Sequence, residues 1–89
     1  MAKPLQHWVL TPHAASEMAR RQIDDDTLAQ VLRSPGQRIS VRRGRDVLQS
    51  LLGFNGKIYV VRVFVDIDRT PPEVVTVYRS SSIEKYWST

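Results

Sequence analysis

Residues 58–67, IYVVRVFVDI, form the longest apolar run of the chain. Apolar side chains occupy both faces of this run, as is typical of a strand at the centre of a sheet. Alternate residues of a strand point to opposite faces, so three valines share one face: Val61, Val63 and Val65. Arg62 and Phe64 share the other face with Val60. We therefore expect a central strand with a valine face for the core and a second face that carries an arginine beside an aromatic ring.

Shorter strand patterns precede this run. Residues 38–43 alternate in polarity, and residues 47–52 return after a polar turn. The Asn55-Gly56 pair that follows is typical of a hairpin turn and leads directly into the central strand. These features predict a meander of neighbouring antiparallel strands.

A last strand is predicted at residues 74–78, after a loop that contains two prolines. Its alternation should turn Val75 and Val77 toward the core and leave Thr76 and Tyr78 on the opposite face. Helices need an apolar floor, so we expect them to cover the valine side of the sheet.

The helices are predicted before the meander. Residues 5–10 are apolar enough for a short edge strand, and Thr11 then supplies an N-cap, with Pro12 at the first position of a helix that runs to about Gln22. A second helix begins after Asp24, and residues 34–36, Ser-Pro-Gly, end it. Its buried stripe consists of Leu28, Val31 and Leu32.

These elements predict a single α+β domain over residues 1–89, with two N-terminal helices packed on one face of a twisted antiparallel sheet of about four strands. A chain of 89 residues has no room for a second core. The carboxylates of residues 24–26 are explained by the N-cap and the helix dipole, and their spacing does not fit a calcium loop.

Composition limits the function classes. The chain has no cysteine, which excludes disulfides, thiolate metal sites and a thiol nucleophile, and fits a reducing cytoplasm. The first ten residues lack the apolar core of a signal peptide, and no stretch reaches the roughly 18 apolar residues of a membrane helix. The formal net charge is +4, and ten of the thirteen basic residues are arginine, whose planar fork suits phosphate groups.

The predicted open face of the sheet is the first candidate site. Arg62, Thr76 and Tyr78 should lie on it, joined by Arg38 and Arg42 if the register of the hairpin allows. Arginines beside an aromatic ring suit RNA, because the charge binds phosphates and the ring stacks on an unpaired base. The alternative is an ordinary polar, solvated sheet face.

The first helix carries a second candidate. His13 and Glu17 are four residues apart and share a helix face, with Arg20 and Arg21 one turn further on. A histidine held by a carboxylate can serve as a general acid or base in phosphodiester chemistry. The alternative is a capping histidine with ordinary surface ion pairs. A zinc site built on His13 and Glu17 would need a third ligand, and His7 is the only other histidine of the chain. We therefore expect neither a metal nor another cofactor. Nothing resembles a nucleophile elbow or a phosphate-binding glycine loop.

A resemblance adds to this interpretation. The order Thr-Pro-His at 11–13, Arg-Arg at 20–21, Ile-Asp-Asp at 23–25, Ser-Pro at 34–35 and Val-Val-Thr-Val-Tyr at 74–78 resembles a small bacterial family of unknown function. That family is related to the RelE-like and BrnT-like toxins, and the resemblance covers roughly residues 10–78. It implies the RelE-like fold.

The toxin relatives bind mRNA and promote attack of a ribose 2′-hydroxyl on the adjacent phosphate. The resemblance implies phosphate contacts from Arg62 and Arg79, stacking or proton transfer by Tyr78 or Tyr86, and added positive charge from Lys85. His13 matches the histidine that marks the uncharacterised family and is not a standard part of the RelE site.

The sequence therefore predicts an RNA-directed, toxin-like protein, in its narrower form an endoribonuclease of a toxin-antitoxin pair. Its partners would be RNA, including ribosome-associated mRNA, and an antitoxin protein. The alternatives are a non-catalytic module that binds RNA or protein, and a scaffold without a ligand. The aromatic pair Tyr86-Trp87 either packs back on the domain or faces a partner.

Overall fold

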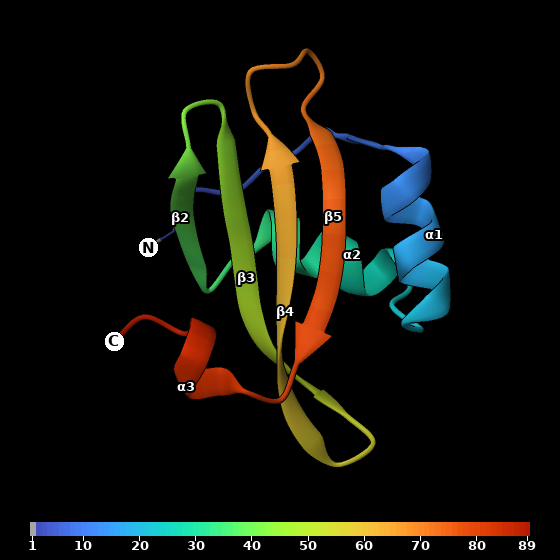
Figure 1. Ribbon diagram of the computed structural model, residues 1–89, viewed down its shortest axis with the longest axis vertical. Helices are drawn as coiled ribbons and strands as arrows, with labels where there is room; N and C mark the ends of the chain where they lie inside the picture. Colours follow the sequence, from blue (N-terminus) through green and yellow to red (C-terminus); the bar gives the residue numbers. More distant parts are fainter. Residues whose placement is uncertain (1) are drawn as a thin grey trace.

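The computed structural model describes residues 2–89 and contains a five-stranded sheet flanked by three short helices (Figure 1). The strands are β1 (Val9–Leu10), β2 (Gln37–Arg42), β3 (Arg45–Phe54), β4 (Lys57–Asp66) and β5 (Glu73–Ser80). Their order across the sheet is β1-β5-β4-β3-β2. The longest apolar run is the middle strand, β4, as predicted. Within residues 2–89, no helix is long and apolar enough to cross a membrane.

The prediction of a RelE-like, purely antiparallel sheet of about four strands is wrong. The sheet is mixed, because β1 pairs in parallel with β5, with Val9 opposite Glu73. Only two residues form β1, held by bonds from Val9 N to Pro72 O at 2.9 Å and from Thr11 N to Val74 O at 3.0 Å. The chain turns into the first helix immediately after these bonds, so β1 is too short to show an alternating pattern in the sequence.

The two N-terminal helices begin at the predicted caps. In α1 (Pro12–Arg20), the Thr11 hydroxyl accepts a hydrogen bond from the backbone of Ala14 at 3.2 Å. In α2 (Asp25–Arg33), the Asp24 carboxylate accepts one from Thr27 at 2.8 Å. A third helix, α3 (Ile83–Tyr86), follows β5 and was not predicted. The helices therefore lie at both ends of the chain.

The core lies between α1, α2 and the valine face of the sheet. The fully buried side chains of this layer come from β3, β4 and β5 and from α1 and α2: Leu48, Val61, Val63, Val65, Val74, Val77, Ala14, Val31 and Leu32. The expectation that Val75 faces the core is wrong. The pairing shifts between Phe64 and Val65, so a bulge in β5 turns Val74 inward instead.

The Asn55-Gly56 pair forms the predicted turn between β3 and β4, with φ of 51° and 80°. Positive φ at both central positions matches the twist of the flanking strands. The two-residue turn sets the register, so Gln49 lies opposite Arg62, and Arg62 in turn lies opposite Tyr78 of β5. This row crosses the middle of the sheet on the face away from α2.

Candidate nucleic-acid interface

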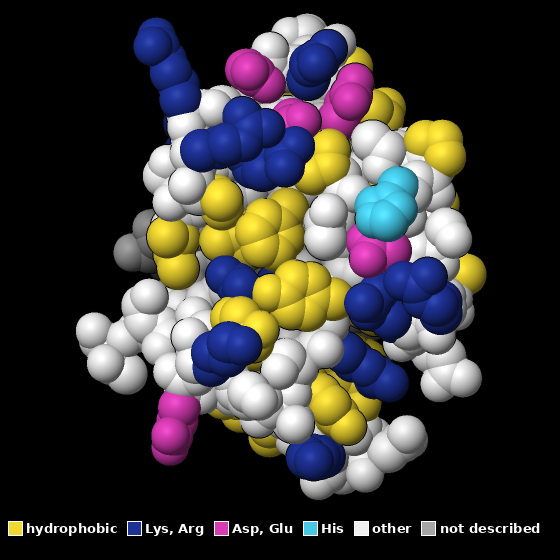
Figure 2. Space-filling model, viewed as in Figure 1, with side chains coloured by type: hydrophobic (Ala, Val, Ile, Leu, Met, Phe, Trp, Pro, Cys, Tyr) yellow, Lys and Arg dark blue, Asp and Glu magenta, His cyan; other side chains and the backbone are white. Residues whose placement is uncertain are grey.

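The open face of the sheet carries a group of five side chains, which we call the Arg62 cluster: Gln49, Arg62, Phe64, Tyr78 and Tyr86. Four belong to β3, β4 and β5, and the fifth, Tyr86, belongs to α3. Figure 2 shows hydrophobic and basic side chains together over the centre of this face. The cluster contains two of the predicted catalytic residues and one of the predicted RNA contacts.

Arg62 is the centre of the cluster. Its Nε donates to Oε1 of Gln49 at 2.8 Å, and its Nη1 donates to the Tyr78 hydroxyl at 2.7 Å. A guanidinium has five N–H donors, so these two bonds leave three without a hydrogen-bond partner among residues 2–89. Within residues 2–89, no carboxylate lies within salt-bridge distance of Arg62. Its positive charge is therefore held in place by neutral groups and is not neutralised.

Aromatic rings surround the same guanidinium. Its central carbon lies 4.4 Å from the ring centroid of Tyr86, 5.2 Å from that of Phe64 and 5.7 Å from that of Tyr78. The rings of Phe64 and Tyr78 are nearly parallel, with centroids 6.0 Å apart. Such cation–π contacts stabilise a partly buried charge without removing it. The arrangement offers both a positive charge and flat ring surfaces.

The two tyrosines of the cluster have pKa values shifted in opposite directions. Burial raises the pKa of Tyr78 above its ordinary 10.0, although the hydrogen bond from Arg62 acts the other way. Hydrogen bonding with Lys85 lowers the pKa of Tyr86 below its ordinary 10.0, and its interaction with Tyr78 acts in the same direction. Neighbouring groups whose pKa values are pushed apart can divide the roles of acid and base.

The C-terminal residues pack back on the domain, which decides between the two alternatives for Tyr86-Trp87. Gln49 donates to the backbone carbonyl of Tyr86 at 3.0 Å. The Trp87 ring lies against Gly36, where an added Cβ would be only 2.7 Å from Cη2 of the ring. Lys85 lies with its ammonium 5.3 Å from the Tyr86 ring centroid. Of the predicted contacts, Tyr86 therefore lies beside Arg62, and Lys85 lies beside Tyr86.

Arg38 does not lie on the open face, so this expectation is wrong. It lies opposite Leu48, a residue of the helix-side core, and shares that side of the sheet. Its Nε donates to Asp46 at 2.7 Å, and its Nη1 donates to the carbonyl of Lys3 at 3.1 Å. The register places Ile39, opposite Val47, on the open face instead. Arg38 is thus part of an ion pair that ties the N-terminal segment to the sheet.

Arg42 lies on the open face but away from the Arg62 cluster. A register shift between Ser40 and Arg42 places Arg42 opposite Arg45. Arg45 forms a two-pronged ion pair with Asp66, at 2.6 and 3.1 Å. This pair, with the hydrogen bond from Arg45 as the main cause, lowers the pKa of Asp66 below its ordinary 3.8. Arg42 therefore lies next to a carboxylate, unlike Arg62.

Arg79 points to the side of the sheet opposite Arg62. It pairs with Val61, whose side chain faces the helix-side core. Its guanidinium carbon lies 4.3 Å from the ring centroid of Phe54 and 4.9 Å from that of Tyr59. The predicted pair of phosphate contacts, Arg62 and Arg79, is therefore separated by the sheet.

His13 lies on α1, the helix beside β5 (Figure 1). Its Nε2 is 3.4 Å from Oε1 of Glu17, and Glu17 also accepts a bond from Nη1 of Arg21 at 3.1 Å. The same carboxylate accepts from the backbone N of Val77 at 3.3 Å, which joins α1 to the strand that carries Tyr78. The side chain of His13 is 68% exposed and that of Glu17 only 9%.

A model of the family described as "Domain of unknown function (DUF4258)" matches residues 10–79. The match covers more than half of the chain. The chain belongs to this family. No curated protein and no solved structure matches it significantly. Nothing in these comparisons links DUF4258 to the RelE-like or BrnT-like toxins, so that relation stays a prediction.

Gln49 is the residue of the Arg62 cluster that the sequence prediction missed. It is fully buried, although it is polar and lies on the open face. A usable signal exists: counting outward from the Asn55-Gly56 turn pairs Phe54 with Lys57 and brings Gln49 opposite Arg62. A buried amide opposite an arginine on a central strand indicates a hydrogen bond between them.

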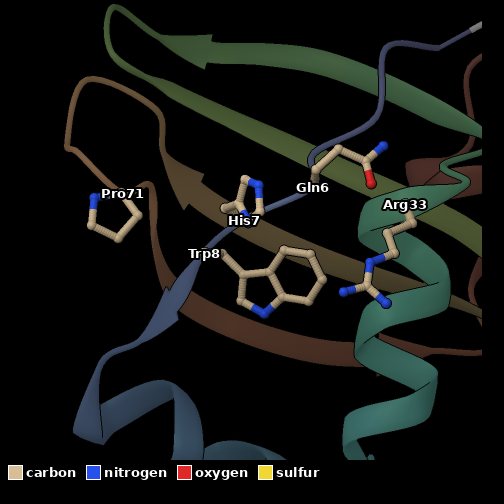
Figure 3. A pocket seen from close by; sticks show the side chains of 5 residues that line it. All are labelled: Gln6, His7, Trp8, Arg33 and Pro71. Carbon is tan, nitrogen blue, oxygen red and sulfur yellow. The ribbon is translucent and has the colours of Figure 1, made fainter.

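A separate pocket of about 340 Å³ lies on the side of the sheet that carries α2 (Figure 3). The Trp8 ring lies under the Arg33 guanidinium, with 5.0 Å between the guanidinium carbon and the ring centroid. His7, from the same N-terminal segment as Trp8, also lines this pocket, whereas His13 does not. Among residues 2–89, no group of three or more potential metal ligands comes together.

Proposed function

We propose that this DUF4258 protein binds single-stranded RNA through the Arg62 cluster. The observation that carries the proposal is the state of Arg62: a cation placed among three rings, bound only to neutral groups, with three N–H donors left over. Such a group binds a phosphate through its donors, while an adjacent ring stacks on an unpaired base.

The shape of the site favours single-stranded RNA over a duplex. The aromatic rings of Tyr78 and Tyr86 can stack only on bases that are free of a helix. The net charge of +4 adds long-range attraction for a polyanion. An RNA-directed role agrees with the predicted place of the chain in the cytoplasm.

RNA cleavage is a second candidate function, supported by the tyrosine pair. Arg62 can only donate hydrogen bonds, so the Tyr78 oxygen is the acceptor and its own O–H is left to donate. Burial keeps Tyr78 protonated to higher pH, whereas Tyr86 loses its proton more readily. In this reaction Tyr86 accepts the 2′-hydroxyl proton as the 2′-O–P bond forms, and Tyr78 donates a proton to the 5′-oxygen as the P–O5′ bond breaks. Arg62 stabilises the charge on the phosphorus oxygens.

The binding proposal is tested by fluorescence anisotropy of a labelled, unstructured RNA at several salt concentrations. We expect log K to fall linearly as log[salt] rises, because bound phosphates release counterions. A DNA strand of the same sequence and an RNA duplex serve as competitors. Absence of binding at low salt, or an affinity that does not depend on salt, would contradict the proposal.

Cleavage is tested on the same RNA by looking for a 2′,3′-cyclic phosphate end. We expect Tyr78→Phe to abolish this product while it retains RNA binding, since the ring remains. Binding without any product would leave a non-catalytic RNA-binding module as the function.

The toxin relation belongs to the same proposal. If cleavage acts on mRNA in the cell, induced expression should arrest growth, and Tyr78→Phe should relieve the arrest. The arrest should also be relieved by an antitoxin protein that covers the Arg62 cluster. Normal growth with full-length protein present would contradict the toxin role and leave RNA binding to be judged by its own assay.

A further inference from the structure

The amide of Gln49 is a junction between Arg62 and the C-terminal strap, by which we mean residues 81–88. Gln49 is fully buried on β3. Its Oε1 accepts from Nε of Arg62 at 2.8 Å. Its Nε2 donates to Oε1 of Gln37 at 2.8 Å and to the backbone carbonyl of Tyr86 at 3.0 Å. No buried polar side-chain atom among residues 2–89 lacks a partner, so every bond of this junction is made.

Arg62 dictates the orientation of this amide. A guanidinium only donates, so the Gln49 atom that faces it must be the oxygen. The NH₂ group of Gln49 must then point to Gln37 and to the strap. The Gln37 oxygen accepts from Gln49 and also from the backbone N of Ser88 at 3.1 Å, which leaves the Gln37 amide nitrogen to donate to the Ser88 carbonyl. A chain of oriented amides thus runs from Arg62 to the end of the strap.

The strap reaches the Arg62 cluster only when it is docked. Trp87 packs against Gly36, where any larger residue would displace the ring, because an added Cβ would lie 2.7 Å from it. The same docking brings the Tyr86 ring to 4.4 Å from the Arg62 guanidinium carbon. A loosened strap therefore removes one stacking ring from the proposed RNA site.

We infer that Gln49 is a positioning residue that couples the Arg62 guanidinium to docking of the C-terminal strap. The inference rests on the proposed RNA-binding function and adds the residue that holds the site together. Coupling of this kind is reciprocal: whatever strengthens the hold of Arg62 on RNA through Gln49 also strengthens docking of the strap, and loss of either contact weakens the other.

The two tryptophans of the chain supply the readout. Full-length protein labelled with fluorotryptophan has two fluorine resonances, which Trp8→Phe assigns. Trp87 reports docking of the strap, and Trp8, on the other side of the sheet, reports global unfolding. Gln49→Met removes the amide at nearly constant length. We expect it to move the Trp87 resonance toward its denatured position, leave the Trp8 resonance in place, and weaken RNA binding roughly tenfold.

Matched variants separate coupling from general damage. Gln30→Met makes the same change on the exposed side of α2 and should alter neither readout. Gln37→Met interrupts the chain of amides beyond Gln49. Gln37 bonds to Gln49 and Ser88 and not to Arg62. We still expect its loss to move the Trp87 resonance and to weaken RNA binding. If Gln49→Met unfolds the protein, so that Trp8 also shifts, Gln37→Met decides the question.

Two results would overturn the inference. One is a Trp87 resonance that stays in place in folded Gln49→Met, or in Gln37→Met if Gln49→Met unfolds. The other is an unchanged RNA affinity in a variant whose Trp87 resonance has moved. A wild-type protein that binds no RNA would overturn the proposed function instead. In that event Arg62→Met still tests the coupling, since it should release Gln49 and move the Trp87 resonance. An unmoved resonance would then refute the coupling as well.

Discussion

The Arg62 guanidinium donates a 2.7 Å hydrogen bond to the hydroxyl of Tyr78, directly across the pair of strands β4 and β5. The two residues face each other in register, so neighbouring strands of the sheet hold both ends of this bond. The bond orients the phenol, because the tyrosine oxygen can only accept from an arginine. Because the oxygen accepts from Arg62, the tyrosine proton is directed elsewhere, toward Tyr86 or a ligand.

The tyrosines of the Arg62 cluster should titrate in a set order. As pH rises, Tyr86 should lose its proton below its ordinary pKa of 10.0, and Tyr78 should lose its proton above that value. Phenolate absorbance of the wild type, Tyr78→Phe and Tyr86→Phe measures the two transitions, with the remaining tyrosine, Tyr59, as the shared background. A Tyr78 that ionises before Tyr86 would contradict the assignment.

The same order predicts the pH profile of RNA cleavage. The base must be deprotonated and the acid protonated, so the rate should rise as Tyr86 loses its proton and fall once Tyr78 loses its own. Tyr86→Phe should remove the rising limb. A rate that is independent of pH across both transitions would exclude these two groups as the acid and base.

Acid should destabilise the protein partly through Asp66. The ion pair with Arg45 lowers the folded pKa of Asp66 below 3.8, so its contribution to stability is present above that value and is lost as pH falls through the folded pKa. We expect Asp66→Asn to lower the free energy of unfolding at neutral pH by about 1 kcal/mol. Its acid dependence should also be flatter than that of the wild type in urea titrations.

The control for this change is Asp68→Asn, which alters an exposed carboxylate in the neighbouring loop. It should change the free energy of unfolding by less than about 0.5 kcal/mol at either pH. Equal losses in the two variants would mean that net charge, and not the ion pair with Arg45, stabilises this end of the sheet.

Glu17 should stabilise the contact between α1 and β5. Its side chain is only 9% exposed and accepts from the backbone of Val77 and from Arg21. Glu17→Gln turns an NH₂ group toward one of these donors and removes the negative charge, and we expect the free energy of unfolding to fall by about 1–3 kcal/mol. His13→Gln, at a side chain that is 68% exposed, should cost less than about 0.5 kcal/mol. Chemical denaturation measures both, and a Glu17→Gln protein as stable as the wild type would contradict this role.

Local signals in the sequence predicted much of the fold. Thr11 and Asp24 cap the helices where their side chains indicated, and the Asn55-Gly56 turn joins the strands that it was predicted to join. The alternation of residues 58–67 correctly separated the core valines from Arg62. Each of these signals depends on neighbours within a few residues of the chain.

The features that the sequence prediction got wrong or missed are set by contacts between residues that are distant in the chain. The parallel pairing of Val9 with Glu73 leaves no periodic pattern, since β1 has only two residues. The bulge that turns Val74 inward in place of Val75 is set by packing against β4. Docked over the sheet, α3 and the residue after it contact Gly36 and Gln49, which are far from Trp87 and Tyr86 in the chain. The sequence correctly placed Arg62 and Tyr78 on one face of the sheet, but it misplaced Arg38, whose face depends on the register between β2 and β3.

The most direct test of the account compares Arg62→Met with Arg79→Met in RNA binding. Each variant removes one positive charge from a guanidinium that lies against aromatic rings, but the two lie on opposite sides of the sheet. We expect Arg62→Met to weaken RNA binding about tenfold or more, and Arg79→Met to weaken it only slightly through net charge. Equal losses in the two variants, or a larger loss in Arg79→Met, would contradict an RNA site on the open face.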